Sequence, residues 1–372
     1  MKKITTVCGD IVPEAFGYAS MHEHTLLTMR PLFAMALTPG APTPELTLSA
    51  LTGLKTGAGW MALREELEYD DVDAETAELE AFKAVGGRGL LDCSYNGCRL
   101  DIRNIRTLQQ RTGVSIVACA GFFSELTYPQ GFDPANAAAI RAHELREIRE
   151  GIDGTDIKAG CIKAGFGPMD AFNGGVMSEN DLKVFRASAG VAAETGYPLA
   201  IHDSFVRENL LTIIDIAVKE CGVAPEKIDI CHLDCYITGK GDHPDLRAYT
   251  KDPAGVVQSF TDFAKRVLDR GVYVNFDGWG AFHTSTAFDG GASWPIDDNR
   301  RLSCLVPLLE DGYASQILFG HDKAGGAFNY HAGAFGYTRF PTFAVPSLIA
   351  MGFEKEAAEI TVANPARFLA HD

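Results

Sequence analysis

The sequence lacks the features that would place the protein in a membrane or on a nucleic acid. No run approaches about 18 uninterrupted apolar residues, and the opening MKKITTVCGDIVPE carries two lysines without a following apolar segment. Basic residues are in deficit, because 33 Lys and Arg face 49 Asp and Glu and give a formal net charge of -16. This charge disfavours nucleic acids and anionic membrane surfaces as partners. We therefore expect a cytoplasmic protein with no nucleic-acid or membrane partner.

Signals for disulfides, nucleotide loops and further domains are missing as well. The nine cysteines are an odd number and include no CxxC pair, so we expect reduced thiols; four lie in apolar, strand-like runs, namely Cys93, Cys119, Cys161 and Cys231. The glycines of GGAFNYHAGAFG have no Walker or Rossmann context. No repeat, low-complexity tract or linker divides the chain, which predicts one domain over residues 1–372.

Short apolar runs alternate with longer helical patterns along the chain, as in βα units with a parallel sheet. The helical patterns cover residues 73–85, 136–151, 180–196 and 256–271, and several close on the glycine expected after a helix. Eight runs are predicted strands: 17–24, 89–94, 114–121, 157–165, 197–204, 227–234, 271–278 and 316–323. This pattern predicts an α/β fold, specifically a (β/α)8 TIM barrel.

The connections after four of these strands are long. They follow the first, sixth, seventh and eighth runs and include LTPGAPTPELT, CYITGKGDHPDLRAYTKDPAG, AFHTSTAFDGGASWP and AGGAFNYHAGAFGYTRFP. In a barrel, the loops after the carboxyl ends of the strands cover the catalytic face. We therefore expect these four loops to form the roof of an active site.

The run GYASMHEHTLL places two histidines one residue apart in an apolar strand. Residues i and i+2 of a strand face the same side, so His22 and His24 point into the barrel mouth and Glu23 points outward. Neighbouring buried imidazoles are costly unless a partner compensates them, and a metal cation is the usual partner. For an isolated HxH motif, a hydrogen-bonded pair of core histidines is the better explanation.

Other strands also end on polar groups, which favours the metal interpretation. His202 ends the fifth run in LAIHDS, His232 the sixth in DICHLD and Asp322 the eighth in LFGHD, while Lys163 lies near the end of the fourth in GCIKAG. Packing explains such a set poorly, because each buried polar residue would need its own partner.

Lys163 differs from the others, since an ammonium repels a metal ion. A lysine held neutral by its surroundings can add carbon dioxide and become a carbamate, an anionic ligand able to bridge two cations. Its alternatives are a snorkelling lysine or an ion-pair partner of Asp322.

These residues resemble the pattern of the amidohydrolase superfamily, and the surrounding phrases resemble its phosphotriesterase family. MHEH, EGIDGTDIKAGCIK, CHLD, ILFGHD and TVANPARFLA occur in family order across nearly the whole chain. The resemblance implies that His22, His24 and Asp322 hold the more buried metal and that His202 and His232 hold the more exposed one. It further implies that carboxylated Lys163 bridges both.

The resemblance also implies a hydrolytic mechanism. A hydroxide shared by two cations attacks a carbonyl or phosphoryl centre, the more exposed cation polarises the electrophile, and Asp322 takes or relays a proton, unless Asp322 serves as a ligand only. The ligand set favours zinc, although manganese, cobalt or iron fits the same groups. The expected cofactors are thus two divalent metal ions and carbon dioxide, held as N6-carboxylysine at Lys163.

Departures from the family bear on the substrate. Gly278 follows Asp277 where organophosphate-hydrolysing members have a histidine, and Arg99 is shifted by one position in NGCRLD. Candidate residues for the substrate come from the roof loops: Lys240, His283, Lys323, Tyr330 and His331. Lysines near such a site would hold a carboxylate or phosphate. Ordinary loop or surface roles compete with this interpretation for Lys240, His283, Tyr330 and His331.

Three functions remain open at this point. The first is a binuclear metal-dependent lactonase that opens a sugar or related lactone, since the resemblance implies that bacterial members with no organophosphate-hydrolysing history are commonly lactonases. The second is hydrolysis of an amide, such as an N-acyl amino compound, or of a phosphotriester at the same site. The third is a ligand-binding barrel without turnover, against which the complete set of expected metal ligands argues. The resemblance also suggests a homodimer.

Overall fold

The structure is a computed structural model, and it describes residues 2–33, 68–167, 175–237, 251–280, 296–325 and 329–372. The roof loops expected after the first, sixth and seventh strands fall largely or wholly outside these ranges. The loop after the eighth strand is described except for residues 326–328.

An eight-stranded sheet forms the centre of the protein, and each described neighbouring pair in it is parallel. Its strands follow one another around the sheet in chain order, which confirms the expected TIM barrel. They are β3 (Ala19–Glu23), β6 (Gly89–Asp92), β7 (Ser115–Gly121), β8 (Cys161–Gly165), β9 (Leu199–His202), β10 (Ile228–Ile230), β11 (Tyr273–Phe276) and β12 (Ile317–Phe319).

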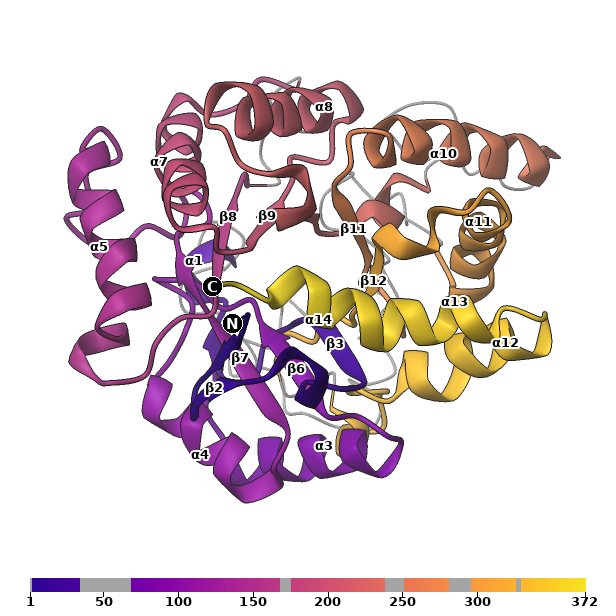
Figure 1. The fold of residues 1–372 in the computed structure, drawn as a ribbon, viewed down its shortest axis with the longest axis horizontal. Coiled ribbons are helices and arrows are strands. Elements are labelled where there is room, and N and C mark those ends of the chain that lie inside the picture. The colour runs from indigo at the N-terminus through magenta and orange to yellow at the C-terminus, as the bar shows by residue number, and fades with distance from the viewer. Residues whose placement is uncertain (1, 34–67, 168–174, 238–250, 281–295, 326–328) are drawn as a thin grey trace, which may run out of the picture.

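Helices surround the strands (Figure 1). Several begin at a side chain that accepts a backbone N–H of the first turn, as Asp71 and Ser178 do, which explains where those helices start. The described helices are α1 (Arg30–Phe33), α3 (Val72–Ala84), α4 (Ile102–Thr112), α5 (Ala137–Arg149), α7 (Glu179–Thr195), α8 (Arg207–Asp215), α10 (Pro253–Leu268), α11 (Asp298–Glu310), α12 (Val345–Ala350), α13 (Glu354–Ala358) and α14 (Asn364–Leu369).

The first and last strands meet where the barrel closes. The backbone N–H of Asp322 donates to the carbonyl of His22 at 3.0 Å, and that of His24 donates to the carbonyl of Lys323 at 3.2 Å. Gly320 permits this approach, because a Cβ there would lie 2.9 Å from the backbone N and O of His22. Closure therefore brings the HxH motif of β3 next to the aspartate that follows β12.

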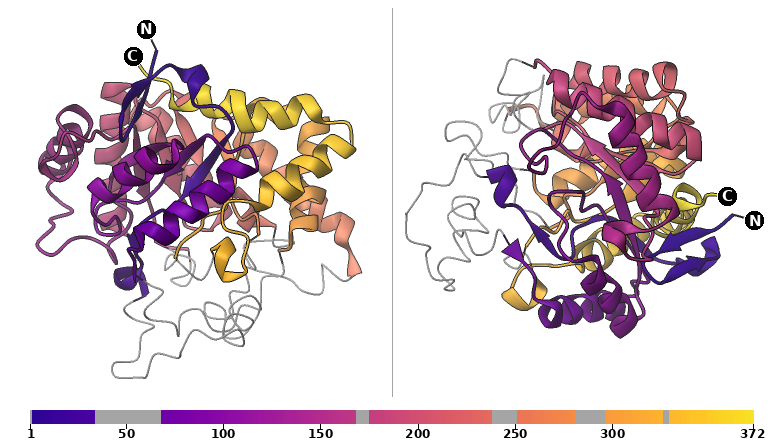
Figure 2. Two further views of the ribbon diagram at one scale, coloured as in Figure 1. Left: turned by 90° about the horizontal axis from the view of Figure 1, so that it is seen from below. Right: turned by 90° about the vertical axis from the view of Figure 1, so that its left-hand side faces the viewer.

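The amino-terminal end of the barrel is covered by segments that the strand pattern did not predict. A hairpin of β1 (Ile4–Thr6) and β2 (Gly9–Ile11) lies there, and a bridge pairs Lys3 with His371. The two termini accordingly lie side by side (Figure 2). A smaller pair, β4 (Leu27–Thr28) and β5 (Glu68–Tyr69), is antiparallel.

Boundaries differ from the expected ones by a few residues at several elements. The fourth strand begins at Cys161 rather than at residue 157; Gly160 instead lies where a Cβ would be 2.2 Å from the Thr5 carbonyl oxygen of the hairpin. The helix expected from residue 256 begins at Pro253, directly after the capping Asp252. None of the described helices is long and apolar enough to span a bilayer.

Candidate metal centre

Four imidazoles form a row at the carboxyl ends of the strands. Their ring centroids are separated by 5.6 Å for His24 and His22, 4.7 Å for His22 and His232, and 4.6 Å for His232 and His202. His22 lies in β3 and His24 directly after it, His202 ends β9, and His232 lies two residues after β10. The parallel barrel thus brings together residues that are up to 210 positions apart in the sequence, as the difference between 232 and 22 shows.

Asp322 faces the first two of these rings. Its Oδ1 lies 3.4 Å from His24 Nε2 and 3.7 Å from His22 Nε2, and ligand atoms of the three residues lie within 4.8 Å of one another. Its side chain is 26% exposed, whereas His22 is 1% exposed. One side of this group is therefore open enough for a substrate to reach it.

Each imidazole is held through its Nδ1 atom. His24 Nδ1 lies 3.0 Å from Ser94 Oγ, and His202 Nδ1 lies 2.8 Å from the Asp203 carbonyl oxygen. Asp277 holds the remaining two, with its Oδ2 at 2.6 Å from His22 Nδ1 and its Oδ1 at 2.8 Å from His232 Nδ1. A ring nitrogen fixed by an acceptor leaves the other nitrogen, Nε2, as the metal ligand.

Asp277 also belongs to the site, although the sequence analysis named it only to give the position of Gly278. It is fully buried, follows β11, and also accepts the backbone N–H of His232 at 3.0 Å. Burial raises the pKa of this carboxyl, but the two imidazoles outweigh burial and bring it well below its usual range. Its position at the end of a predicted strand, like that of the other site residues, was the signal that could have identified it.

The charge states of the ligands follow from these neighbours. Burial, together with the Lys163 ammonium, lowers the pKa of His22 to about 3, so its ring is neutral and able to bind a cation at neutral pH. Burial acts on His232 as well, but the Asp277 carboxylate outweighs it and raises the pKa to about 9. Ligation by His232 near neutral pH therefore requires the release of a proton.

Asp322 is ionised throughout the neutral range. Burial raises its pKa, but the hydrogen bond with His24 and the neighbouring imidazoles of His22 and His232 outweigh burial and keep that pKa well below its usual value. Its backbone φ is +50°, and His232 has a φ of +60°. These left-handed conformations are uncommon outside glycine and cluster at functional sites.

Lys163 lies beside the row of imidazoles, next to His22. Its Nζ is 3.4 Å from His22 Nε2 and 3.1 Å from Cys231 Sγ, and the residue is 1% exposed. In the described part of the chain, no carboxylate lies within 4.0 Å of this ammonium, so the suggested ion pair with Asp322 is not formed.

The expectation that the surroundings hold Lys163 neutral is not supported by these contacts. Burial lowers the pKa of the ammonium, but the sulfur atoms of Cys231 and Cys93 favour the charged form, and the balance raises that pKa. Addition of carbon dioxide therefore requires proton loss, and metal binding is a process that drives ligand deprotonation.

The donor set fits a pair of divalent cations. Three of the histidines are at least nine-tenths buried, one ionised carboxylate faces two of the rings, and the buried Lys163 lies beside His22. Nitrogen and carboxylate oxygen are the usual ligands of zinc and of other first-row metals. Packing alone explains this set poorly, because the Nε2 atoms of His22 and His24 both face the Asp322 carboxylate, within 3.7 Å of its Oδ1.

Of the five residues expected to bind substrate, the structure describes three. Lys240 and His283 lie outside the described residues. Lys323 is 2% exposed, and its Nζ donates to Oε2 of the buried Glu75 at 2.7 Å. Tyr330 is 51% exposed, and His331 is exposed with its Nδ1 held by Glu78 at 2.6 Å.

Gly278 has a structural explanation in this chain. A Cβ at this position would lie 2.4 Å from Arg301 Nη2 and 2.6 Å from Asp234 Oδ2, and these two residues form a fully buried ion pair at 2.6 Å. The space that a histidine would take is thus filled by Arg301. Arg99, the other departure, forms a buried ion pair with Glu147 at 3.1 Å.

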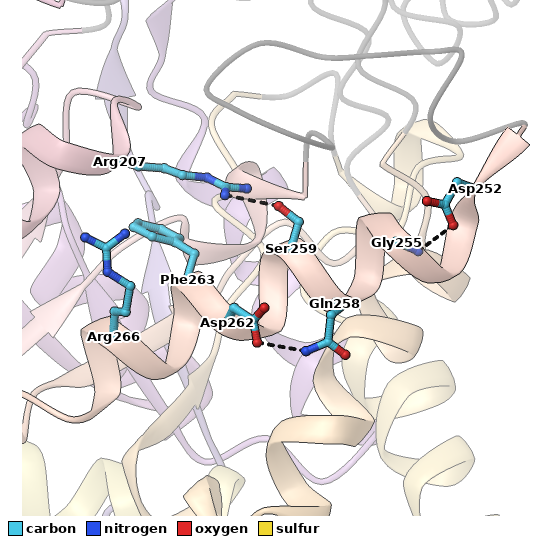
Figure 3. Close-up of a pocket in the computed structure, with 8 residues that line it drawn as sticks. All are labelled: Arg207, Asp252, Gly255, Gln258, Ser259, Asp262, Phe263 and Arg266. Atoms are coloured by element: carbon cyan, nitrogen blue, oxygen red, sulfur yellow. Dashed lines mark hydrogen bonds between the residues drawn. The ribbon is translucent and has the colours of Figure 1, made fainter.

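A separate groove of about 500 Å³ lies between α8 and α10 (Figure 3). It is lined by Arg207, Phe263, Arg266 and five further residues, none of which belongs to the metal centre. Arg207 donates to Ser259 Oγ at 3.2 Å and packs over the Phe263 ring, so its guanidinium is already engaged.

Comparison with known proteins gives the class to which this fold and centre belong. The phosphotriesterase family matches residues 2–247 and 257–369. The chain belongs to this family of metal-dependent hydrolases, which confirms the expected family and the hydrolytic class of enzyme.

Individual relatives are more distant. N-acetyltaurine hydrolase from Xenopus tropicalis is 27% identical over 374 residues, covering 99% of this chain and 97% of the relative. Its human counterpart is 26% identical over 375 residues with the same coverage.

A resiniferatoxin-binding protein from Rhodobacter sphaeroides has a similar structure, with a TM-score of 0.80, 24% identity, and coverage of 99% of this chain and 94% of that protein. A lactonase from Listeria monocytogenes has a TM-score of 0.72, 21% identity, and coverage of 100% and 99%. These structural likenesses support the fold.

Proposed function

We propose that this protein is a binuclear metal-dependent hydrolase that cleaves an N-acyl amide, releasing an amine and a carboxylic acid. The hydrolase part of this proposal is carried by the row of four imidazoles at one end of the barrel, with Asp322 facing two of the rings and Lys163 beside His22. The amide part rests on the full-length similarity to N-acetyltaurine hydrolases.

The residues divide between two cation positions. His22, His24 and Asp322 would hold the more buried cation, His202 and His232 the more exposed one, and Lys163, as N6-carboxylysine formed with carbon dioxide, would bridge them. Zinc suits this set of imidazole and carboxylate ligands. When bound, the cations would polarise the substrate carbonyl and make water acidic enough to attack near neutral pH.

Asp322 is the proposed proton carrier. Its carboxylate is ionised at neutral pH and partly exposed, so its free oxygen can take the proton of the attacking water. The same oxygen would return the proton to the leaving nitrogen, which an amide needs because an unprotonated amide anion is a poor leaving group. Asp277 would keep His22 and His232 oriented during this transfer.

A lactone is the second candidate substrate, and it was the first choice from the sequence. Lactone opening needs the same attack on a carbonyl but releases an alkoxide, which places a smaller demand on Asp322. The similarity to solved lactonases is below 25% identity and supports the barrel only. The same holds for the resiniferatoxin-binding protein, whose ligand is not assigned to this chain.

A hydrolysis panel tests the proposed function. Purified protein with two equivalents of zinc would be assayed with N-acetyltaurine, N-acetyl amino acids, γ- and δ-lactones and a paraoxon-type triester. We expect the highest kcat/KM for an N-acetyl compound, and loss of that activity when the metal is chelated. Turnover of lactones alone would contradict the amide assignment, and a rate that survives chelation would contradict the metal-dependent mechanism.

A further inference from the structure

Glu23 lies between two proposed metal ligands in the sequence, yet its side chain points to the opposite side of β3. It is 0% exposed and belongs to none of the groups that contact the proposed cations. A buried carboxyl group needs several hydrogen-bond donors, so its partners reveal what it does.

Three of these donors come from the residues on either side of Asp322. Glu23 Oε1 accepts the backbone N–H of His321 at 2.9 Å and the ring Nδ1–H of the same residue at 2.6 Å. Glu23 Oε2 accepts the backbone N–H of Lys323 at 3.1 Å. Ser20 Oγ, from the same strand as Glu23, also donates to Oε1. One carboxyl group therefore holds the peptide groups on both sides of Asp322.

The hydrogen bonds of Glu23 to His321 and Lys323 join the first and last strands of the barrel, β3 and β12, where the barrel closes. Within the described chain, β3 and β12 share no strand ladder, and they are joined by the two backbone hydrogen bonds between residues 22–24 and 322–323. Next to these two backbone bonds, the Glu23 side chain adds its hydrogen bonds to His321 and Lys323, and we call this set of side-chain bonds the clamp. Because His22 and His24 flank Glu23, any shift of the clamp changes the position of both imidazoles relative to Asp322.

The backbone of Asp322 explains why such a clamp is needed. Its φ of +50° is unfavourable for a residue other than glycine and persists only where surrounding contacts fix it. The bonds to the N–H groups of residues 321 and 323 fix the peptide planes next to this strained residue. His321 is in turn held by stacking on Phe340, at 4.6 Å between ring centroids, which connects the clamp to the carboxyl-terminal helices.

We infer that Glu23 is a positioning residue for the His22/His24/Asp322 cation position. It sets the separation between the two imidazoles of β3 and the carboxylate that follows β12, and it does so without touching the cation. This inference rests on the proposed two-cation function and assigns to the second residue of the HxH motif a role of its own.

The test compares Glu23→Gln with the wild-type protein in manganese titrations followed by electron paramagnetic resonance. The Gln amide keeps one acceptor but turns an NH2 group toward a backbone N–H, so the clamp loses at least one bond. We expect about a 10- to 100-fold weaker affinity at one of the two positions, the range found when groups that orient metal ligands are removed. The coupled two-manganese signal should give way to a single-manganese signal at substoichiometric metal.

His202→Asn identifies the affected position. This variant removes a ligand of the other position and should keep one tightly bound manganese ion, whereas Glu23→Gln/His202→Asn should keep none. Glu144→Gln is the matched control, because Glu144 is an equally buried carboxyl on α5 that contacts Ser188 and no residue of the site. It should bind two ions as the wild-type protein does. If Glu23→Gln does not fold, Glu23→Asp, whose shorter side chain cannot reach both N–H groups, replaces it.

Unchanged affinity at both positions in Glu23→Gln would overturn the inference, and so would an equal weakening at both, which would indicate a general structural role. A wild-type protein that binds fewer than two ions would instead contradict the proposed function, so the two failures are distinguishable.

Discussion

At the scale of single residues, one glycine beside the centre matters for packing. Gly278 lies one position after Asp277 and donates its N–H to Asp234 Oδ2 at 3.1 Å, while Arg301 fills the adjacent space. Arg301 is fully buried between Asp234 and Asp298, and removing a partner from such a pair leaves an uncompensated buried charge. The glycine is therefore part of how the loop after β11 packs.

Gly278→Ala should destabilise the protein by about 1–3 kcal/mol, because the new Cβ collides with Arg301 Nη2 and must displace a buried ion pair. Urea denaturation of both proteins measures the difference. Gly113→Ala is the control: Gly113 has a φ of +73° but no atom within 4 Å of an added Cβ, so it reports backbone strain without a collision. A free energy of unfolding for Gly278→Ala equal to the wild-type value would refute this packing argument.

Sequence reasoning located the six proposed ligands because each one interrupts an apolar strand at its carboxyl end. It did not identify the roles of Asp277 and Glu23, since their partners are fixed only when strands far apart in the chain are brought together. It also expected a neutral Lys163, whereas the nearby sulfur atoms favour its charged form. The contact between Lys163 and the cysteine sulfur atoms depends on which side chains meet inside the barrel. The periodicity of a single strand does not show which side chains of other strands it will meet.

At the scale of elements, the eight parallel strands could be predicted because each combines a short apolar run with a following helix pattern. The hairpin β1–β2 could not, because its strands have three residues each and form a pair that only covers the end of the barrel. Helix packing adds a further feature that periodicity does not reveal. Glu144 of α5 is buried against α7, where Ser188 Oγ donates to its Oε1 at 2.5 Å.

This helix contact predicts a pH-dependent stability. Burial raises the pKa of Glu144 from its ordinary 4.5 to about 8, so the folded protein holds a proton between these values that the unfolded chain does not. The free energy of unfolding contributed by this group therefore falls as pH rises from about 4.5 to about 8. Glu144→Gln, which keeps the acceptor for Ser188 but does not titrate, should be more stable than the wild-type protein at pH 8.5 by roughly 1–3 kcal/mol.

Urea denaturation at pH 5.5 and pH 8.5 measures this effect as the difference between Glu144→Gln and the wild-type protein at each pH. Taking the difference removes the pH dependence of all other groups. The difference should grow toward the higher pH. A difference that is the same at both values would show that Glu144 is not protonated in the folded protein.

At the scale of the whole molecule, barrel closure assembles the centre. The ligands come from five strand ends, and the first and last strands meet through the backbone of His22 and Asp322 and through the side chain of Glu23. The four-histidine row, Asp322 and Lys163 then face one another only in the complete barrel. Because cations bind this folded arrangement and not the unfolded chain, they should also stabilise the closed barrel.

The most direct test of the two-cation centre is the metal content of Lys163→Ala, determined by elemental analysis together with its rate on the best N-acetyl substrate. We expect two equivalents of metal in the wild-type protein, fewer than two in the folded variant, and loss of nearly all activity. Added acetate or propionate should partly restore both quantities, since a short carboxylate can occupy the space of the lysine stem and bridge the cations, whereas chloride should not. Full metal occupancy with a near-normal rate in Lys163→Ala would contradict the bridged two-cation centre.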